Sequence, residues 1–155
     1  MSLDSVRAFF TQNAPDIAII ETPESSATVA LAAAAHGVEP ARIAKTLSLR
    51  IGERVVLLVA RGDARLDNRK AKAALGGKPR MLDADEVEAL TGHPVGGVCP
   101  FGLTTPLQVY CDISLRAFDE VVPAAGSTQS AVRISPERMA ALTGAEWIDV
   151  CQDVV

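Results

Sequence analysis

Two stretches near the middle of the chain carry the clearest hydrophobic pattern. Residues 42–50 alternate between apolar and polar side chains, which is typical of a half-buried strand. Residues 54–60, RVVLLVA, are continuously apolar and rich in β-branched side chains, which indicates a strand at the centre of a sheet. The three residues between them, Ile51-Gly52-Glu53, fit the turn of a β-hairpin. We therefore expect a hairpin whose second strand is central.

Helix signals alternate with further short strands along the rest of the chain. Caps, terminal glycines and helical spacing predict helices over residues 3–12, 22–36, 67–75, 83–91 and 135–143. Apolar runs predict strands over residues 79–83, 107–114, 120–126, 130–135 and 146–150. The strands at 120–126 and 130–135 suggest a second hairpin, closed by Gly126-Ser127-Thr128-Gln129. This mixture predicts a single α+β domain over residues 1–155.

Lys45 breaks the pattern of its strand, because it falls on the face that Ile43, Leu47 and Leu49 share. Burying a charged side chain without a partner is costly. Two interpretations stay open from the strand alone. Lys45 could extend its ammonium group to water or protect a sheet edge from pairing. It could instead line a pocket and hold an anionic or carbonyl group.

The loop over residues 93–106, HPVGGVCPFGLTTP, is long and rich in glycine and proline. Gly96 and Gly97 would let backbone N–H groups approach a ligand closely, while Pro100 fixes the bend. The alternative is a structural crossover loop, although a long irregular segment in a compact domain favours function. The loop matches neither the spaced glycines of a dinucleotide site nor those of a phosphate-binding P-loop.

Charge is distributed unevenly along the chain. The net charge is −4, but residues 41–80 hold eleven basic and three acidic side chains, a net of +8. The remaining residues carry −12, so the chain could dock a polyanion on one side. A solvated helix face is the alternative interpretation. No helix-turn-helix or basic recognition helix supports DNA binding.

The cysteines and the first residues of the chain indicate the cellular compartment. Cys99, Cys111 and Cys151 are odd in number and lack CxxC spacing, which argues against a disulfide framework or a zinc site and suits a reducing cytoplasm. The first residues lack a basic region followed by an apolar core, so we do not expect a secretory signal, and the chain has no apolar run long enough for a membrane helix. Cys99 is a weak candidate for a nucleophile, because no cysteine–histidine–carboxylate set can be identified from spacing.

Three motifs together resemble the YbaK/ProX family of aminoacyl-tRNA deacylases, free-standing relatives of the editing domain of prolyl-tRNA synthetase. They are IAKTL on an early strand, TGHPVGGVCPFGL in the middle, and an AAG turn before a strand, helix and strand. The resemblance implies a small mixed β-barrel or curved sheet surrounded by helices. It implies hydrolysis of the ester that joins a wrong amino acid to tRNA, most often the tRNA for proline.

The resemblance also assigns site residues. The essential lysine of the family maps onto Lys45 and its polar neighbour onto Thr46, the substrate loop onto Gly96 to Pro100, and the polar turn onto Gly126 to Ser130. Ile20-Glu21-Thr22 and Thr128-Gln129 depart from the cysteine-specific branch and favour alanine or another small aliphatic amino acid. We expect Lys45 to point into a cavity that faces the loop at 96–100.

The expected mechanism needs neither a metal nor a cofactor. Lys45 would hold the substrate carbonyl, ribose or terminal phosphate, and the amides of Gly96 and Gly97 would stabilise the oxyanion. Water would be the nucleophile, with the ribose 2′-OH as a candidate to orient it. The remaining predicted substrate-binding residues are Ile43, Leu47, Val98, Cys99, Pro100, Phe101, Gly126, Ser127, Thr128 and Ser130.

The basic segment would then bind the acceptor end of the tRNA through phosphate contacts. The predicted tRNA-binding residues are Arg61, Arg65, Arg69, Lys70 and Lys72. Prolyl-tRNA synthetase is a further candidate partner, whereas DNA and membranes are not expected. A non-catalytic module that binds tRNA or a synthetase is the alternative function, because the same lysine and loop could serve binding alone.

Overall fold

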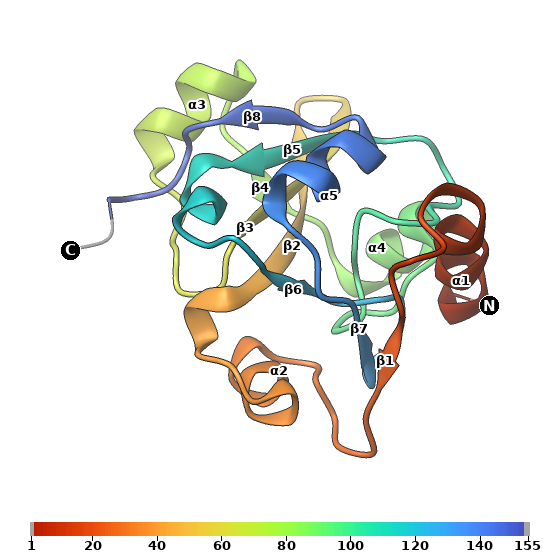
Figure 1. The fold of residues 1–155 in the computed structure, drawn as a ribbon. Coiled ribbons are helices and arrows are strands. Elements are labelled where there is room, and N and C mark those ends of the chain that lie inside the picture. The colour runs from red at the N-terminus through yellow and green to blue at the C-terminus, as the bar shows by residue number, and fades with distance from the viewer. Residues whose placement is uncertain (1, 154–155) are drawn as a thin grey trace.

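The predicted central hairpin is the core of the sheet in the computed structural model, which describes residues 2–153. Strand β2 (Ile43–Ile51) pairs antiparallel with β3 (Arg54–Arg61) from Ala44 opposite Arg61 to Ile51 opposite Arg54. Gly52, with φ +61°, occupies the turn. Five consecutive residues of β3 are buried, which confirms its predicted central position (Figure 1).

The other strands build a mixed sheet around this hairpin. Strand β5 (Gln108–Asp112) lies parallel to β3, and β8 (Glu146–Ile148) lies parallel to β5. On the far side of β2 lie β4 (Arg80–Met81), which is antiparallel, and β6 (Val122–Pro123), which is parallel. The strand order β4-β2-β3-β5-β8 does not close on itself, so the predicted α+β fold is confirmed in its curved-sheet form.

The outer edge of β2 is only partly covered. Strand β6 pairs with Ile43 and Ala44, and β4 pairs with Leu49 and Arg50. Leu82 N–H extends the second contact by donating to Ser48 O at 3.1 Å. The backbone groups of alternate strand residues point to the same side. Since those of Ala44 and Ser48 face outward, those of Thr46 face a gap between β6 and β4.

The five α-helices follow the predicted order. They are α1 (Ser2–Asn13), α2 (Val29–His36), α3 (Asn68–Leu75), α4 (Ala84–Thr91) and α5 (Pro136–Thr143), with 3₁₀ turns at Pro40–Arg42 and Ile113–Ala117. The predicted caps Asp67 and Ser135 each accept a backbone N–H. None of the helices within residues 2–153 is long and apolar enough to cross a bilayer.

The predicted start of the second helix at Thr22-Pro23 is wrong. The helix begins after Thr28, whose hydroxyl accepts from Leu31 N–H. The preceding residues are extended because they pair with the polar turn at 126–129. Thr22 N–H donates to Gln129 O at 2.9 Å, and Ser26 N–H donates to Thr128 O. A long-range contact therefore replaces the helical turn that the local cap signal favours.

The predicted second hairpin forms only in part. Bridges join Val121 to Ile134 and Ala124 to Ala131 across the turn. The regular pairing of both segments lies elsewhere, because β6 pairs with β2, and β7 (Ser130–Ala131) pairs with β1 (Ile20–Glu21).

Two hydrophobic cores fill the two faces of the sheet. The first packs α1 and α5 against the residues that include Leu57, Val59 and Phe101. The second packs α3 and the C-terminal segment against Leu49, Leu58 and their neighbours. Helices α2 and α3 lie at opposite ends of the molecule (Figure 1). Different parts of the chain therefore cover the two faces of β2.

Candidate functional site

The gap beside β2 opens into a cavity of about 240 Å³. Its walls come from β2, from the segment before α2 and α2 itself, from β4 and α4, and from the residues around β6 and β7. The lining is mainly apolar. It consists of Ser26, Ala27, Thr28, Val29, Ala32, Ile43, Ala44, Lys45, Thr46, Ser48, Met81, Leu82, Val87, Val95, Gly96, Val98, Val122, Ala124, Ser130 and Ala131.

Thr46 is the polar residue at the centre of this wall. Its hydroxyl oxygen is buried, and it has no hydrogen-bond partner within residues 2–153. Its backbone groups face the gap between β6 and β4, as the pairing of its neighbours requires. An unsatisfied buried hydroxyl costs free energy unless a ligand or water pairs with it. Thr46 therefore presents its hydroxyl and its outward-facing backbone N–H and C=O to an occupant of the cavity.

Lys45 lines the cavity, but its ammonium group points elsewhere. Nζ donates to the carbonyl oxygen of Ala64, which belongs to the second core. Burial lowers the pKa of Lys45, while Cys151 and Asp63 act in the opposite direction. The expectation that the ammonium group faces the loop at 96–100 is therefore not met in this structure. The alternation of β2 places Lys45 on the face of Leu49, away from Thr46.

The Gly96–Gly97 pair forms a tight turn at the cavity wall. Gly97 N–H donates to Pro94 O at 2.9 Å, and Gly96 has φ +91° while Val95 has no positive φ. These features define a type II turn with glycine at its third position. Gly96 lines the cavity, but the amide of Gly97 is already bonded within the turn, so only the Gly96 amide remains a candidate oxyanion donor.

Close backbone contacts explain why both positions are glycine. A Cβ on Gly96 would lie 2.9 Å from Ala27 Cβ, and one on Gly97 would lie 2.8 Å from the backbone of Ser127. Gly126 N–H also donates to Gly97 O at 3.1 Å. The turn at 94–97 is therefore wedged between the segment before α2 and the polar turn at 126–129.

Val98 also lines the cavity, but the predicted site residues that follow it are structural. Cys99, Pro100 and Phe101 are buried outside the cavity, with Cys99 and Phe101 in the first core. Burial raises the pKa of the Cys99 thiol to about 12, so it stays protonated and is no nucleophile. These three residues do not contact the cavity because the apolar side chains of this segment turn inward.

Leu47 and the tip of the polar turn also lie outside the cavity lining. Leu47 packs against the second core, because it shares the face of Lys45. Gly126, Ser127 and Thr128 support the wall from behind. Ser127 Oγ lies 2.6 Å from Ser130 Oγ, and Ser130 itself lines the cavity.

A buried histidine connects these loops to α1. His93 Nε2 lies 2.7 Å from Phe101 O, and His93 Nδ1 lies 2.5 Å from the hydroxyl of Ser2. The same hydroxyl oxygen also lies 2.5 Å from Gly126 O. Burial lowers the pKa of His93, which keeps the ring neutral near pH 7. His93 is thus a buried structural partner and not a base in the cavity.

A family model described as the aminoacyl-tRNA editing domain matches residues 23–142. The chain belongs to this family. The resemblance inferred from the Lys-Thr-Leu strand and the glycine-proline loop is confirmed. Helix α1 lies outside the matched range, although its Ser2 contacts a turn that supports the cavity.

Individual relatives agree with this assignment of an editing domain. YwhH of Bacillus subtilis (strain 168), for which no function is named, is 48% identical over 155 residues and covers 99% of both chains. EbsC of Enterococcus faecalis, named as a candidate Cys-tRNA(Pro)/Cys-tRNA(Cys) deacylase, is 30% identical over 74% of this chain and 71% of its own. A solved structure described as a candidate trans-editing enzyme for prolyl tRNA synthetase has a TM-score of 0.90 at 34% identity, covering 98% of both chains.

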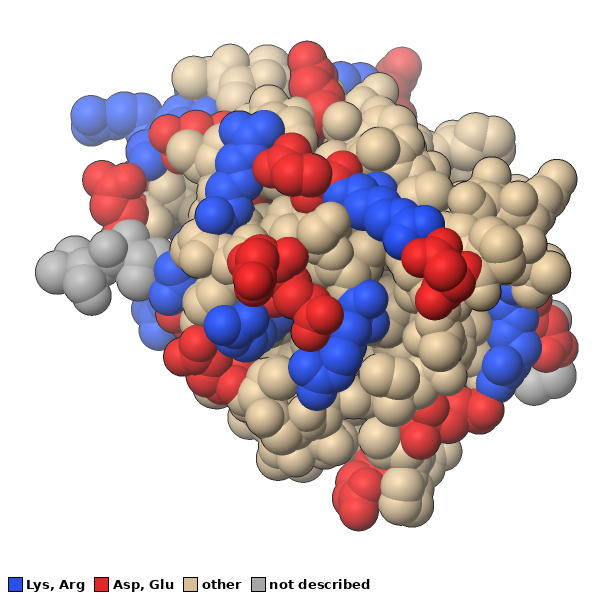
Figure 2. Space-filling model, viewed as in Figure 1, with Lys and Arg blue, Asp and Glu red and all other residues tan. Residues whose placement is uncertain are grey.

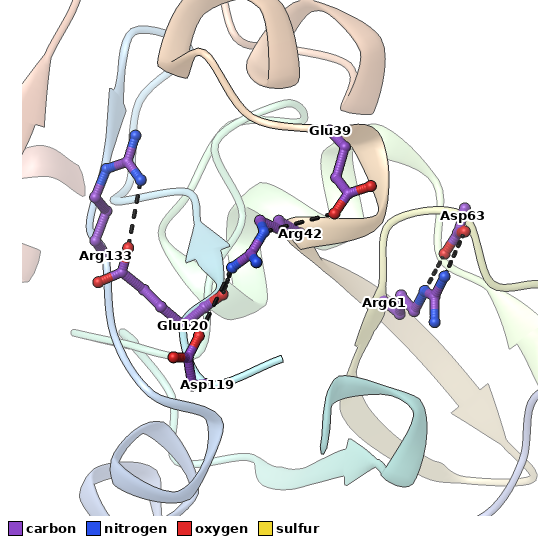
Figure 3. Close-up of polar contacts among 7 residues, drawn as sticks. All are labelled: Glu39, Arg42, Arg61, Asp63, Asp119, Glu120 and Arg133. Atoms are coloured by element: carbon purple, nitrogen blue, oxygen red, sulfur yellow. Dashed lines mark hydrogen bonds and ion pairs between the residues drawn. The ribbon is translucent and has the colours of Figure 1, made fainter. Parts of the chain in front are cut away.

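The predicted tRNA-binding cations of this editing domain fall into two groups. Arg61 is held by Asp63 at 2.6 Å (Figure 3). Lys70 is held by Asp149 and Asp153. Arg65, Arg69 and Lys72 are exposed and form no ion pair within the described part of the chain. Figure 2 shows acidic and basic side chains interspersed over one face, without a continuous basic patch.

Several wall residues of the cavity were not predicted from the sequence. Ser26, Ala27 and Val29 precede or begin α2, and Leu82 and Val87 belong to the β4–α4 region. The alanine-rich helix signalled close packing, but no local pattern shows that one packed face borders a cavity. These residues meet β2 only through long-range contacts.

Proposed function

We propose that the protein is a trans-editing hydrolase that deacylates misacylated tRNA, with tRNA for proline as the favoured acceptor. Membership of the editing-domain family supports hydrolytic editing, and the functions named for EbsC and for the trans-editing structure support the choice of tRNA. A cytoplasmic location follows from this proposal, because aminoacyl-tRNA is made and used there.

The observation that carries the proposal is the Thr46 hydroxyl, which has no partner among the described residues and lies in a mainly apolar cavity at a sheet gap. An aminoacyl ester has an ammonium group and a carbonyl oxygen near each other. The Thr46 carbonyl and hydroxyl can accept from the ammonium group, and the Thr46 N–H can donate to the carbonyl oxygen. The substrate would thus supply the hydrogen bonds that the sheet lacks at this point.

The chemistry is addition of water to the ester carbonyl. The bond between the carbonyl carbon and the ribose oxygen then breaks, and the proton of the water moves to that oxygen. Free amino acid and tRNA with its terminal hydroxyl are released. The Gly96 amide and the positive charge of Lys45 stabilise the negative charge that develops on the carbonyl oxygen. Lys45 would leave Ala64 to approach the substrate.

The cavity limits the amino acid side chain by size. Its volume of about 240 Å³ is below the roughly 300–1,000 Å³ typical of sites for drug-sized ligands. Ile43, Val98 and Val122 supply apolar walls. Such walls separate side chains that differ by one methylene by only about 10- to 200-fold. We therefore propose alanine, cysteine or another small amino acid as the group removed.

The test is deacylation of one tRNA for proline charged in turn with alanine, cysteine, serine or proline. We expect rapid release of at least one small amino acid and slow release of proline. Thr46→Val is the matched variant, because it removes the hydroxyl at nearly constant volume. Tight binding of the charged tRNA without release of any amino acid would identify a binding module and refute the hydrolase. Activity should survive chelation by EDTA.

A further inference from the structure

Two exposed apolar side chains lie at the cavity. Met81 is 61% exposed and Val95 is 59% exposed, yet both line the cavity, whose other apolar walls include the almost fully buried Ala44 and Val122. Exposed apolar groups concentrated at one opening mark a binding surface.

The fold itself does not require these side chains to be apolar. Val95 occupies the second position of the type II turn at 94–97, a position open to many residue types. Met81 belongs to a two-residue edge strand and pairs only with Leu49. Polar residues at both places would cost the free protein little, so their apolar character indicates a ligand.

Two cations precede Met81 in the chain. Lys78 and Arg80 are exposed, and neither forms an ion pair within residues 2–153. Arg80 also sits opposite Arg50 in the β2–β4 pairing, and like charges at such positions are destabilising. Arg50 is compensated by Glu86 at 2.6 Å, but Arg80 is not. The rim therefore combines apolar surface with unpaired positive charge, which is the chemistry that binds a nucleotide.

We propose that Met81 and Val95 form a shelf for the terminal adenine base of the tRNA, with Arg80 and Lys78 contacting the phosphate of that nucleotide. This inference rests on the proposed function. The ester and the base are attached to the same ribose, so an amino acid in the cavity places the base at its mouth. The methionine sulfur makes favourable contacts with aromatic rings, which suits a chain with only 4% aromatic residues.

Binding of the base can be measured without any catalysis. In ¹³C-methyl-methionine NMR, we expect adenosine 5′-monophosphate to move the Met81 methyl signal through the ring current of the base. Met139 is fully buried in the first core and serves as an internal control whose signal stays in place. Ribose 5-phosphate, which lacks the base, should leave the Met81 signal close to its original position.

Deacylation then tests the same residues with the full substrate. Met81→Gln and Val95→Thr keep side-chain size but remove apolar character, and each should raise KM for aminoacyl-tRNA about 10-fold with kcat little changed. Ile113→Thr removes another exposed apolar side chain, 42% exposed and outside the cavity lining, and should leave KM unchanged. Arg80→Gln should weaken binding of adenosine 5′-monophosphate but not of adenosine.

Two results would overturn the shelf. One is a Met81 methyl signal that does not move at about 10 mM adenosine 5′-monophosphate, a concentration sufficient for a Kd of about 1 mM. The other is an unchanged KM in Met81→Gln and Val95→Thr while the wild-type protein deacylates tRNA. If the nucleotide moves the Met81 signal but no charged tRNA is hydrolysed, the shelf stands and the proposed hydrolase fails.

Discussion

The backbone N–H of Gly126 donates to the carbonyl oxygen of Gly97 at 3.1 Å, which joins the two turns behind the cavity. Gly97 itself meets the backbone of Ser127 so closely that no side chain fits between them. The relative position of the two turns therefore depends on a contact between backbones, and the cavity wall that includes Gly96 and Ser130 depends on it in turn.

Gly97→Ala should separate these turns. A Cβ would lie 2.8 Å from backbone atoms of Ser127, and such overpacking costs about 1–3 kcal/mol in unfolding free energy. We also expect kcat to fall, because the wall shifts. Gly77→Ala is the control, since its Cβ would meet only a side-chain methyl of Ile51 at 3.0 Å. Equal unfolding free energies for the two variants would contradict the wedge.

Thr46→Val should leave the fold intact and lower kcat/KM about 10-fold. The hydroxyl has no partner in the free protein, so its removal loses no internal hydrogen bond. The substrate would lose one bond to a buried group, worth about 1 kcal/mol or more. Thr46→Ser keeps the hydroxyl and should retain most of the activity. Wild-type kinetics in Thr46→Val, with unfolding midpoints measured in parallel, would remove Thr46 from the site.

Lys45→Met should nearly abolish deacylation while the protein stays folded. Methionine keeps the apolar stem but removes the buried charge, whose pKa burial already lowers. Loss of a group that stabilises the developing oxyanion typically lowers kcat about 100- to 1,000-fold. Arg116→Met, which removes a surface cation bound to Glu137, is the control for charge alone. A Lys45→Met enzyme with more than half of the normal rate would exclude the assigned role.

Arg69 and Lys72 should contribute binding that depends on salt. Both are exposed and without an ion pair in the described residues, so they are free to contact phosphates. In the double variant Arg69→Gln/Lys72→Gln, KM should rise at low salt. The slope of log KM against the logarithm of the salt concentration should fall by about 1–2. Arg138→Gln is the matched control, because Arg138 is occupied by Asp16 at 2.6 Å. A slope that stays the same would place the tRNA elsewhere.

Both histidines should make the fold sensitive to mild acid. Burial lowers the pKa of His93 and of His36, with Arg133 adding to the effect on His36. The unfolded chain then binds more protons than the folded protein, so stability falls as the pH drops below about 6.5. We expect a lower thermal midpoint at pH 5.5 than at pH 7.5, and a weaker dependence in His36→Gln. A flat profile in the wild type would contradict this linkage.

The alternation of β2 predicted its side-chain faces correctly, because parity depends only on strand geometry. Lys45 and Leu47 share a face, and Thr46 and Ser48 share the other, which borders the cavity. The alternation could not show which face carries the cavity. The position of the cavity depends on which segments pack against each face of β2, and these segments are distant from β2 in the sequence.

The glycine-proline loop is a second case in which the local sequence could not show which side chains face the cavity. Its composition predicted Gly96 as a site residue, and Gly96 lines the cavity, while its role in the site stays a prediction. The apolar run around Cys99 and Phe101 was assigned to the site along with it, although those side chains pack inward. Apolar residues beside flexible ones can line a pocket or anchor a loop, and only the position of α1 decides between these.

The short gap in the edge of β2 limits the length of what can bind there. Paired backbone ends at Ala44 and resumes at Ser48, so an extended chain of several residues would collide with β6 or β4. We expect this interval to admit a single aminoacyl group but not a peptide joined through its C-terminus. The protein should therefore spare peptidyl-tRNA, and nascent chains on the ribosome would be safe from an enzyme that removes single amino acids.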